Sequence, residues 1–162
     1  IQVGALTDPS VVAVLLAEVP RIVVAAPALL QQYPPINQVA QLGDLPWLAL
    51  TSFYRNEIAL QHKDKGEPMN LPIVPLLSSD SLFAVRKAAL AGLGTAILST
   101  WVIQEDLAQG NLIQLMPEWQ APPLPVWLTY PWASYYPARL TAFFAMIKAV
   151  FPHLTGARPA SG

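Results

Sequence analysis

The chain has 162 residues, enough for one ordinary domain, and 54% of them are hydrophobic, which is ample for a core. Its net charge is −1 with no basic run, so the chain by itself is not expected to hold DNA, because that binding rests on lysine and arginine side chains. The absence of cysteine excludes disulfides, thiolate catalysis and zinc–sulfur sites, and it fits a reducing compartment. No apolar run reaches membrane-spanning length.

The first third of the chain predicts short, alternating elements. Asp8 as N-cap and Pro9 at the first helical position predict a short helix over residues 9–17. A strand over 21–26, a short helix over 27–32, a helical turn over 37–42 and an apolar strand over 47–50 follow, and residues 51–56 are predicted to form a loop.

The middle of the chain predicts an antiparallel ribbon and then a capped helix. Residues 58–62 and 71–77 are expected to pair across the turn at 63–66, with Pro72 and Pro75 keeping the second segment at a sheet edge. Asp80 is expected to cap a helix, and Gly92 and Gly94 are expected to end it before a buried strand over 95–98.

The last third repeats the alternation of helix and strand. A helix over 99–109 stopped at Gly110, a strand over 112–115, a proline-rich connector over 120–125, a strand over 126–130 and an amphipathic helix over 137–151 are predicted. Such alternation favours the α/β class with a mostly parallel, doubly wound sheet.

The sequence offers little to a catalytic or metal site. Its two histidines, His62 and His153, stand in a charged turn and near the end of the chain, and no nucleophile-elbow, zinc-protease or phosphate-loop motif occurs. We therefore expect no enzymatic activity, no metal and no cofactor.

Binding of a small molecule is better supported. In open α/β sheets, ligands lie beyond the carboxyl ends of the strands. Two loops are placed that way: Thr51, Ser52, Phe53 and Tyr54 follow one strand, and Ser78, Ser79, Asp80 and Ser81 precede the main helix. Hydroxyl and backbone N–H groups suit a carboxylate, and the phenyl ring suits an apolar body. The alternative is that these polar residues only form a turn and a helix cap.

Several segments, taken in order, resemble the effector-binding domain of LysR-type transcriptional regulators. The segments are IQVGALTD, RIVVAAPALLQQY, DLPWLAL, AALAGLGTAIL, EDLAQGNLIQLMPEW and VWLTYP followed by ARLTAFFAMI. Gln2 stands where the family usually has arginine, and Ala26 and Leu29 replace its serine and tyrosine. Each segment is degenerate alone, whereas the ordered set is specific.

The resemblance implies a two-subdomain fold like that of type II periplasmic binding proteins, with a small molecule in the cleft. Residues 1–19 and 131–162 would belong to subdomain one, whose first half would be missing, and residues 20–130 to subdomain two. The effector loop would fall on Thr51, Ser52 and Phe53, with Ser79 near the cleft.

The implied protein is a cytoplasmic homodimer or homotetramer that senses a small effector, most simply a carboxylate. It would contact DNA only through an N-terminal domain absent from this sequence, and it would not contact a membrane. A solute-binding protein of a transport system, built on the same fold, is the alternative.

Overall fold

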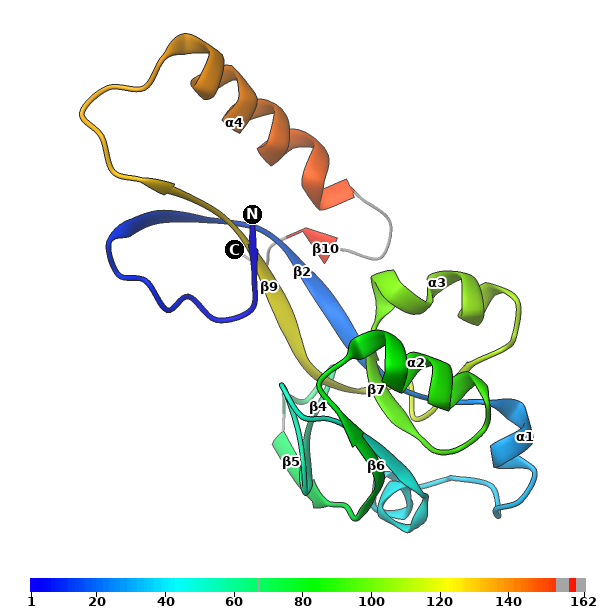
Figure 1. The fold of residues 1–162 in the computed structure, drawn as a ribbon. Helices are drawn as coiled ribbons and strands as arrows, with labels where there is room; N and C mark the ends of the chain where they lie inside the picture. The colour runs from blue at the N-terminus through cyan, green and yellow to red at the C-terminus, as the bar shows by residue number, and fades with distance from the viewer. Residues whose placement is uncertain (67, 154–157, 160–162) are drawn as a thin grey trace. The chain divides into compact units, whose positions relative to one another are not determined.

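The computed structural model describes residues 1–66, 68–153 and 158–159 (Figure 1). The chain forms two compact units, one from residues 1–20 and 123–162 and the other from residues 21–122. Strands β2 (Val11–Ala25) and β9 (Trp119–Pro131) each contribute residues to both units. The subdomain boundaries implied by the family resemblance remain a prediction. No described helix is both long and apolar enough to cross a membrane.

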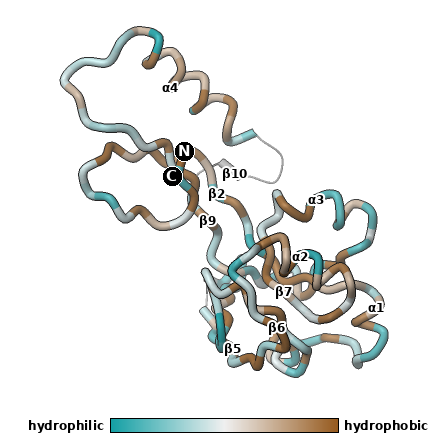
Figure 2. The backbone as a smooth tube through the Cα atoms, in the orientation of Figure 1, coloured by the Kyte–Doolittle hydropathy of each residue, from teal (hydrophilic) through white to brown (hydrophobic). Residues whose placement is uncertain are grey.

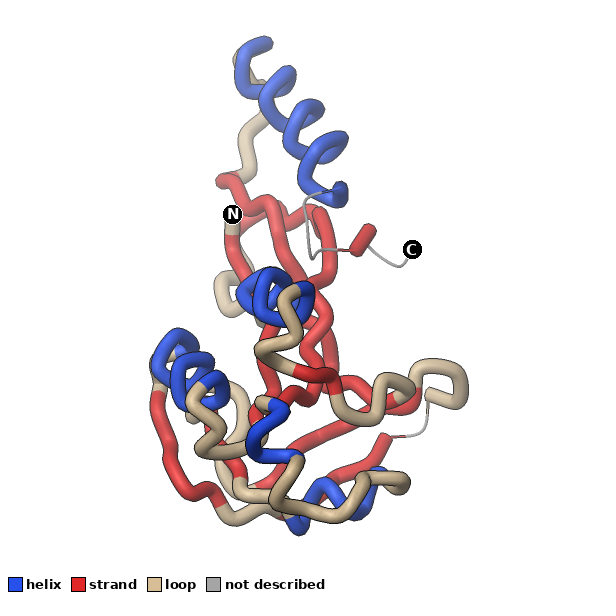
Figure 3. Tube along the Cα trace, turned by 90° about the vertical axis from the view of Figure 1, so that its right-hand side faces the viewer, coloured by secondary structure: helices blue, strands red, loops and turns tan. Residues whose placement is uncertain are grey.

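The unit of residues 21–122 is built around short buried strands flanked by helices (Figures 1 and 3). Strand β3 (Trp47–Leu50) pairs in parallel with β6 (Pro75–Ser79), while β7 (Ala96–Ser99) and β8 (Ile113–Gln114) pair antiparallel with β2. A hairpin of β4 (Glu57–His62) and β5 (Pro68–Pro72) completes the strands.

Helices α1 (Pro27–Leu30), α2 (Leu82–Leu90), α3 (Thr100–Ala108) and a 3-10 helix (Val39–Asp44) accompany these strands. Trp47, Leu48, Val23 and Leu98 are fully inaccessible to solvent and form the centre of the core. The hydrophobic colouring of β2 and β7 in Figure 2 follows this core.

The other unit has smaller apolar clusters. Strand β1 (Gln2–Val3) pairs with β9, and β10 (Arg158–Pro159) pairs with β2. Helix α4 (Ala138–Val150) and a 3-10 helix (Phe151–His153) pack Phe144, Ile147 and Phe151 against Leu16, Ala17 and Leu128. The opposite face of α4 is exposed at Phe143, Met146 and Val150, so the predicted amphipathic helix is covered on one side only.

Two predicted segments form strand where a helix or a connector was expected. Residues 11–17 belong to β2, because Val11, Val12 and Val14 are β-branched and favour an extended chain, while Asp8 accepts hydrogen bonds from the backbone N–H and hydroxyl of Ser10 instead of capping a helix. Residues 120–125 continue strand β9. Their prolines have a fixed φ that an extended chain tolerates.

The expected mostly parallel sheet is also corrected. Apart from β3 with β6 and one bridge between Trp47 and Thr95, the strand pairs whose register the structure gives are antiparallel. The alternation of helix and strand along a chain does not fix strand direction when one long strand, here β2, pairs with several later segments. The segment 71–77 likewise divides into β5 and β6, which pair with different partners.

The ends of helix α2 differ in part from those predicted. Ser81, rather than Asp80, is the N-cap, and its hydroxyl accepts a hydrogen bond from the backbone N–H of Ala84 at 3.3 Å. Gly92, with φ of 75°, ends the helix as predicted, but Gly94 has another role. A Cβ at Gly94 would lie 3.0 Å from the carbonyl oxygen of Pro46, so this glycine permits close packing of the chain on β3.

Candidate functional pocket

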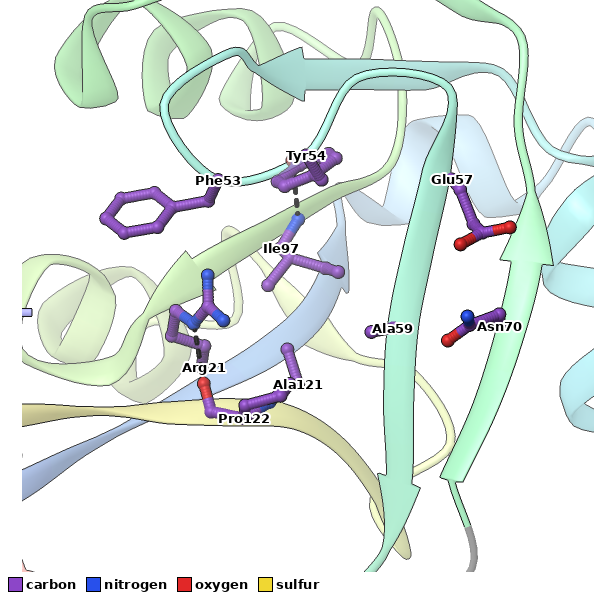
Figure 4. A pocket seen from close by; sticks show the side chains of 9 residues that line it. All are labelled: Arg21, Phe53, Tyr54, Glu57, Ala59, Asn70, Ile97, Ala121 and Pro122. Carbon is purple, nitrogen blue, oxygen red and sulfur yellow. Dashed lines mark hydrogen bonds between the residues drawn. The ribbon is translucent and has the colours of Figure 1, made fainter. Parts of the chain in front are cut away.

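A cavity of about 350 Å³ lies within the unit of residues 21–122 (Figure 4). This volume lies in the range of small-molecule sites, about 300–1,000 Å³. Its polar lining comes from Arg21, Tyr54, Glu57 and Asn70, and its apolar lining from Phe53, Ala59, Ile97, Ala121 and Pro122. The cavity is therefore formed by segments that are far apart in the sequence.

Arg21 supplies a half-buried positive charge to this cavity. Its Nε donates a hydrogen bond to the carbonyl oxygen of Pro122 at 2.8 Å, and its guanidinium carbon lies 4.9 Å from the centre of the Phe53 ring. Burial lowers the pKa of Arg21, against the smaller opposing influence of Tyr54. No carboxylate among the described residues forms an ion pair with Arg21. A partly dehydrated cation without a counter-charge is a good partner for an anion.

Tyr54 fixes the loop that carries Phe53. Its hydroxyl donates a hydrogen bond to the carbonyl oxygen of Leu48 at 2.7 Å. It also accepts one from the backbone N–H of Ile97 at 3.1 Å (Figure 4). Burial raises the pKa of Tyr54 to about 12. The phenol is therefore neutral at pH 7 and acts as a bridge between β3 and β7.

The hairpin of β4 and β5 supplies the remaining polar wall. Ile58 and Leu60 are buried on one face of β4, so Glu57 and Ala59 lie on the other face. Ala59 pairs directly with Asn70 across the hairpin, which places the Asn70 amide on the same face. Glu57 and Asn70 are exposed and line the cavity.

The structure brings together the two loops predicted from the sequence. The backbone N–H of Thr51 donates a hydrogen bond to the carbonyl oxygen of Ser79 at 2.9 Å, at the carboxyl ends of the parallel strands β3 and β6. Phe53 lines the cavity, whereas Thr51, Ser52 and Ser79 are not among its lining residues. The hydroxyl of Ser79 accepts a hydrogen bond from the N–H of Ser81. The assignment of these four residues to an effector site stays a prediction.

Sequence reasoning missed Arg21, Glu57 and Asn70. A signal was present for Arg21, the one charged residue in the strand segment predicted over 21–26. Glu57 and Asn70 carried no such signal, because the register of the hairpin decides that both side chains lie on the same face. The described residues contain no group of three or more histidine, cysteine, aspartate or glutamate side chains placed to hold a metal ion.

Comparison with known proteins identifies the family. Residues 1–152 match the model of the LysR substrate binding domain. The chain belongs to this family. Within that family of transcription regulators, it corresponds to the effector-binding regulatory domain, and the alternative of a transport protein is not favoured.

Named relatives agree with this LysR assignment. The chain is 26% identical over 156 residues to the transcriptional regulator PtxR of Pseudomonas aeruginosa, covering 91% of this chain and 47% of that protein. It is 30% identical over 164 residues to the transcriptional activator AaeR of Escherichia coli, covering 96% of this chain and 52% of that protein. The chain thus spans about half the length of the curated relatives that it matches.

Solved structures support the same LysR fold. The regulatory domain of AphB from Vibrio vulnificus matches with a TM-score of 0.74 and 25% identity, covering 91% of this chain and 73% of that chain. The regulatory domain of CrgA from Neisseria meningitidis matches with a TM-score of 0.69 and 26% identity, covering 90% and 71%. These matches support the predicted α/β fold of the type II periplasmic-binding-protein kind.

Proposed function

We propose that this domain binds a small carboxylate and that binding controls an attached DNA-binding domain of a cytoplasmic, oligomeric, non-enzymatic regulator. The observation that carries the proposal is Arg21, a half-buried cation in a cavity of ligand size, without a carboxylate partner among the residues described. The membership of the LysR family supports the regulatory role.

The two parts of the site have complementary tasks in this proposal. The Nε of Arg21 is bonded to the carbonyl oxygen of Pro122, which fixes the orientation of the guanidinium. Its remaining N–H groups are available to a carboxylate. The ring of Phe53 covers the guanidinium and offers apolar contact to the body of the ligand. Thr51 and Ser52 follow β3, and Ser79 is the last residue of the adjacent β6. At these strand ends their hydroxyl groups would serve the same ligand, since the N–H of Thr51 already bonds Ser79.

Substitution of Arg21 tests the proposal. A hydrogen bond to a charged group contributes about 1.5–3 kcal/mol, so Arg21→Gln should weaken benzoate binding to the full chain about 10- to 150-fold. Arg139→Gln is the control, since Arg139 is exposed, lies on α4 and does not line the cavity. Isothermal titration calorimetry with benzoate measures both variants.

The same titration tests the predicted loop. Thr51→Ala or Ser52→Ala should weaken binding by a comparable factor if these side chains reach the carboxylate. Unchanged affinity in both would leave them as turn residues. Unchanged affinity in Arg21→Gln, or no binding of carboxylates by the unaltered chain, would contradict the proposed function.

A further inference from the structure

The cavity has walls of opposite charge. Arg21 and Phe53 lie on one side of Figure 4, and Glu57 and Asn70 lie on the other, with Ala59, Ile97 and Ala121 between them. Arg21 comes from β2, whereas Glu57 and Asn70 come from the hairpin of β4 and β5.

These opposite charges do not neutralise each other. In the described part of the chain, neither an ion pair nor a hydrogen bond joins Arg21 to Glu57. The guanidinium is held by Pro122 and lies beside Phe53, while the Glu57 side chain projects from the exposed face of the hairpin. A ligand that fills the cavity therefore meets a cation at one end and a carboxylate at the other.

We infer that the effector carries one carboxylate and, at its far end, a hydrogen-bond donor, either a hydroxyl or an ammonium group. This inference rests on the proposed function, because it assumes that the first carboxylate binds Arg21. An ionised Glu57 only accepts hydrogen bonds, so it selects donors and repels a second carboxylate. The amide of Asn70 can donate or accept and so does not oppose either kind of donor group.

The middle of the cavity selects the body of the ligand. Phe53, Ile97 and Ala121 present apolar groups, and the small side chains of Ala59 and Ala121 leave room between the charged walls. A flat ring fits such a space and stacks favourably with Phe53. The inferred class is thus a ring-bearing monocarboxylate with a distal donor, and dicarboxylates are disfavoured.

Benzoate derivatives test this class directly. Benzoate is the reference, meta- and para-hydroxybenzoate carry a hydroxyl donor, meta- and para-(aminomethyl)benzoate carry an ammonium donor, and isophthalate and terephthalate carry a second carboxylate. Calorimetric titration of the full chain should show at least one hydroxyl or ammonium derivative binding about tenfold more tightly than benzoate, the low end for a charge-assisted hydrogen bond. Both dicarboxylates should bind more weakly than benzoate.

Glu57→Gln isolates the charge of that wall while keeping its size. In this variant the donor derivatives should bind no more than about threefold more tightly than benzoate, because only a neutral hydrogen bond remains. The two dicarboxylates should no longer bind more weakly than benzoate. If Glu57→Gln lowers the affinity for the ammonium derivatives more than the affinity for the hydroxyl derivatives, the donor is an ammonium group. If it lowers both affinities equally, the donor is a hydroxyl. Glu105→Gln, which removes an exposed carboxylate outside the cavity, is the control and should change none of these ratios.

A second variant tests the same wall in the opposite direction. Asn70→Asp adds a negative charge on the exposed face of the hairpin and should strengthen the rejection of dicarboxylates. If benzoate binds through Arg21 but donors give no advantage, or Glu57→Gln leaves the ratios unchanged, the inferred ligand class is wrong and the carboxylate site stands. If no carboxylate binds, or Arg21→Gln has no effect, the proposed function itself fails.

Discussion

At the scale of single residues, Tyr54 connects the core to the cavity. Its hydroxyl joins the carbonyl oxygen of Leu48 and the N–H of Ile97, two backbone groups inside the unit of residues 21–122. Because the preceding residue is Phe53, the same hydrogen bonds set the position of the ring beside Arg21. Tyr54 thus positions the Phe53 ring against Arg21 in the proposed anion site.

The titration of Tyr54 gives a prediction about alkaline stability. Burial raises its pKa from the ordinary 10.0 to about 12, so the neutral phenol stabilises the fold below pH 10 and this stabilisation is lost as the pH rises to 12. The loss should amount to on the order of 2 kcal/mol in the free energy of unfolding. Urea denaturation across this pH range measures it.

Tyr54→Phe should lower stability at neutral pH by about 1–3 kcal/mol, because two buried backbone groups lose their partner, and should flatten the alkaline slope. Tyr33→Phe, at a partly buried tyrosine packed beside the core, is the control and should keep the slope. If the free energy of unfolding falls equally with alkaline pH in Tyr54→Phe and in the unaltered chain, the ionisation of Tyr54 does not cause the loss of stability.

At the scale of elements, α2 and α3 are joined by one bidentate ion pair. Nε and Nη2 of Arg86 donate to the two carboxylate oxygens of Asp106 at 2.7 and 2.9 Å, and the Asp106 side chain is only 7% exposed. This contact raises the pKa of Arg86, chiefly through the hydrogen bond to Asp106. The pair fixes the two helices that flank β7.

Removal of Arg86 should destabilise the fold by leaving a buried carboxylate without its partner. Arg86→Met is expected to lower the free energy of unfolding by about 1.5–3 kcal/mol. Lys87→Met, at the exposed next position, should change it by less than about 0.5 kcal/mol. Chemical denaturation compares the two, and similar losses would mean that the ion pair contributes little.

At the scale of the whole molecule, the exposed face of α4 indicates association. No residue of α4 is fully buried, and Phe143 and Met146 are 46% and 52% exposed. Contiguous apolar surface of this kind marks interaction sites or drives aggregation. Only 12% of residues are charged, so few charges oppose such contact.

We therefore expect the 162-residue chain alone to self-associate or bind hydrophobic dye. The double substitution Phe143→Ser with Met146→Ser should reduce association in sedimentation velocity, whereas Phe144→Ser should destabilise the unit, because Phe144 packs on Leu16 and Leu128. A chain that stays monomeric at high concentration without dye binding would contradict the importance of this face.

The sequence by itself determined the elements that local signals define. The apolar run of β3 was predicted at residues 47–50, and glycine stops at Gly92 and Gly110 gave the ends of two helices. The ordered motifs predicted the LysR family, which the family match confirms. Such features are readable because periodicity and backbone conformation act over a few neighbouring residues.

Only the tertiary structure decided the direction of the strands and the composition of the pocket. Residues 11–17 became strand because pairing and β-branched side chains outweighed a plausible helix start at Asp8 and Pro9. The pairing of the core strands and the register of one hairpin bring four residues to the lining of one cavity: Arg21, Phe53, Glu57 and Asn70. Contacts between residues so far apart in the chain depend on global packing, which no local sequence pattern encodes.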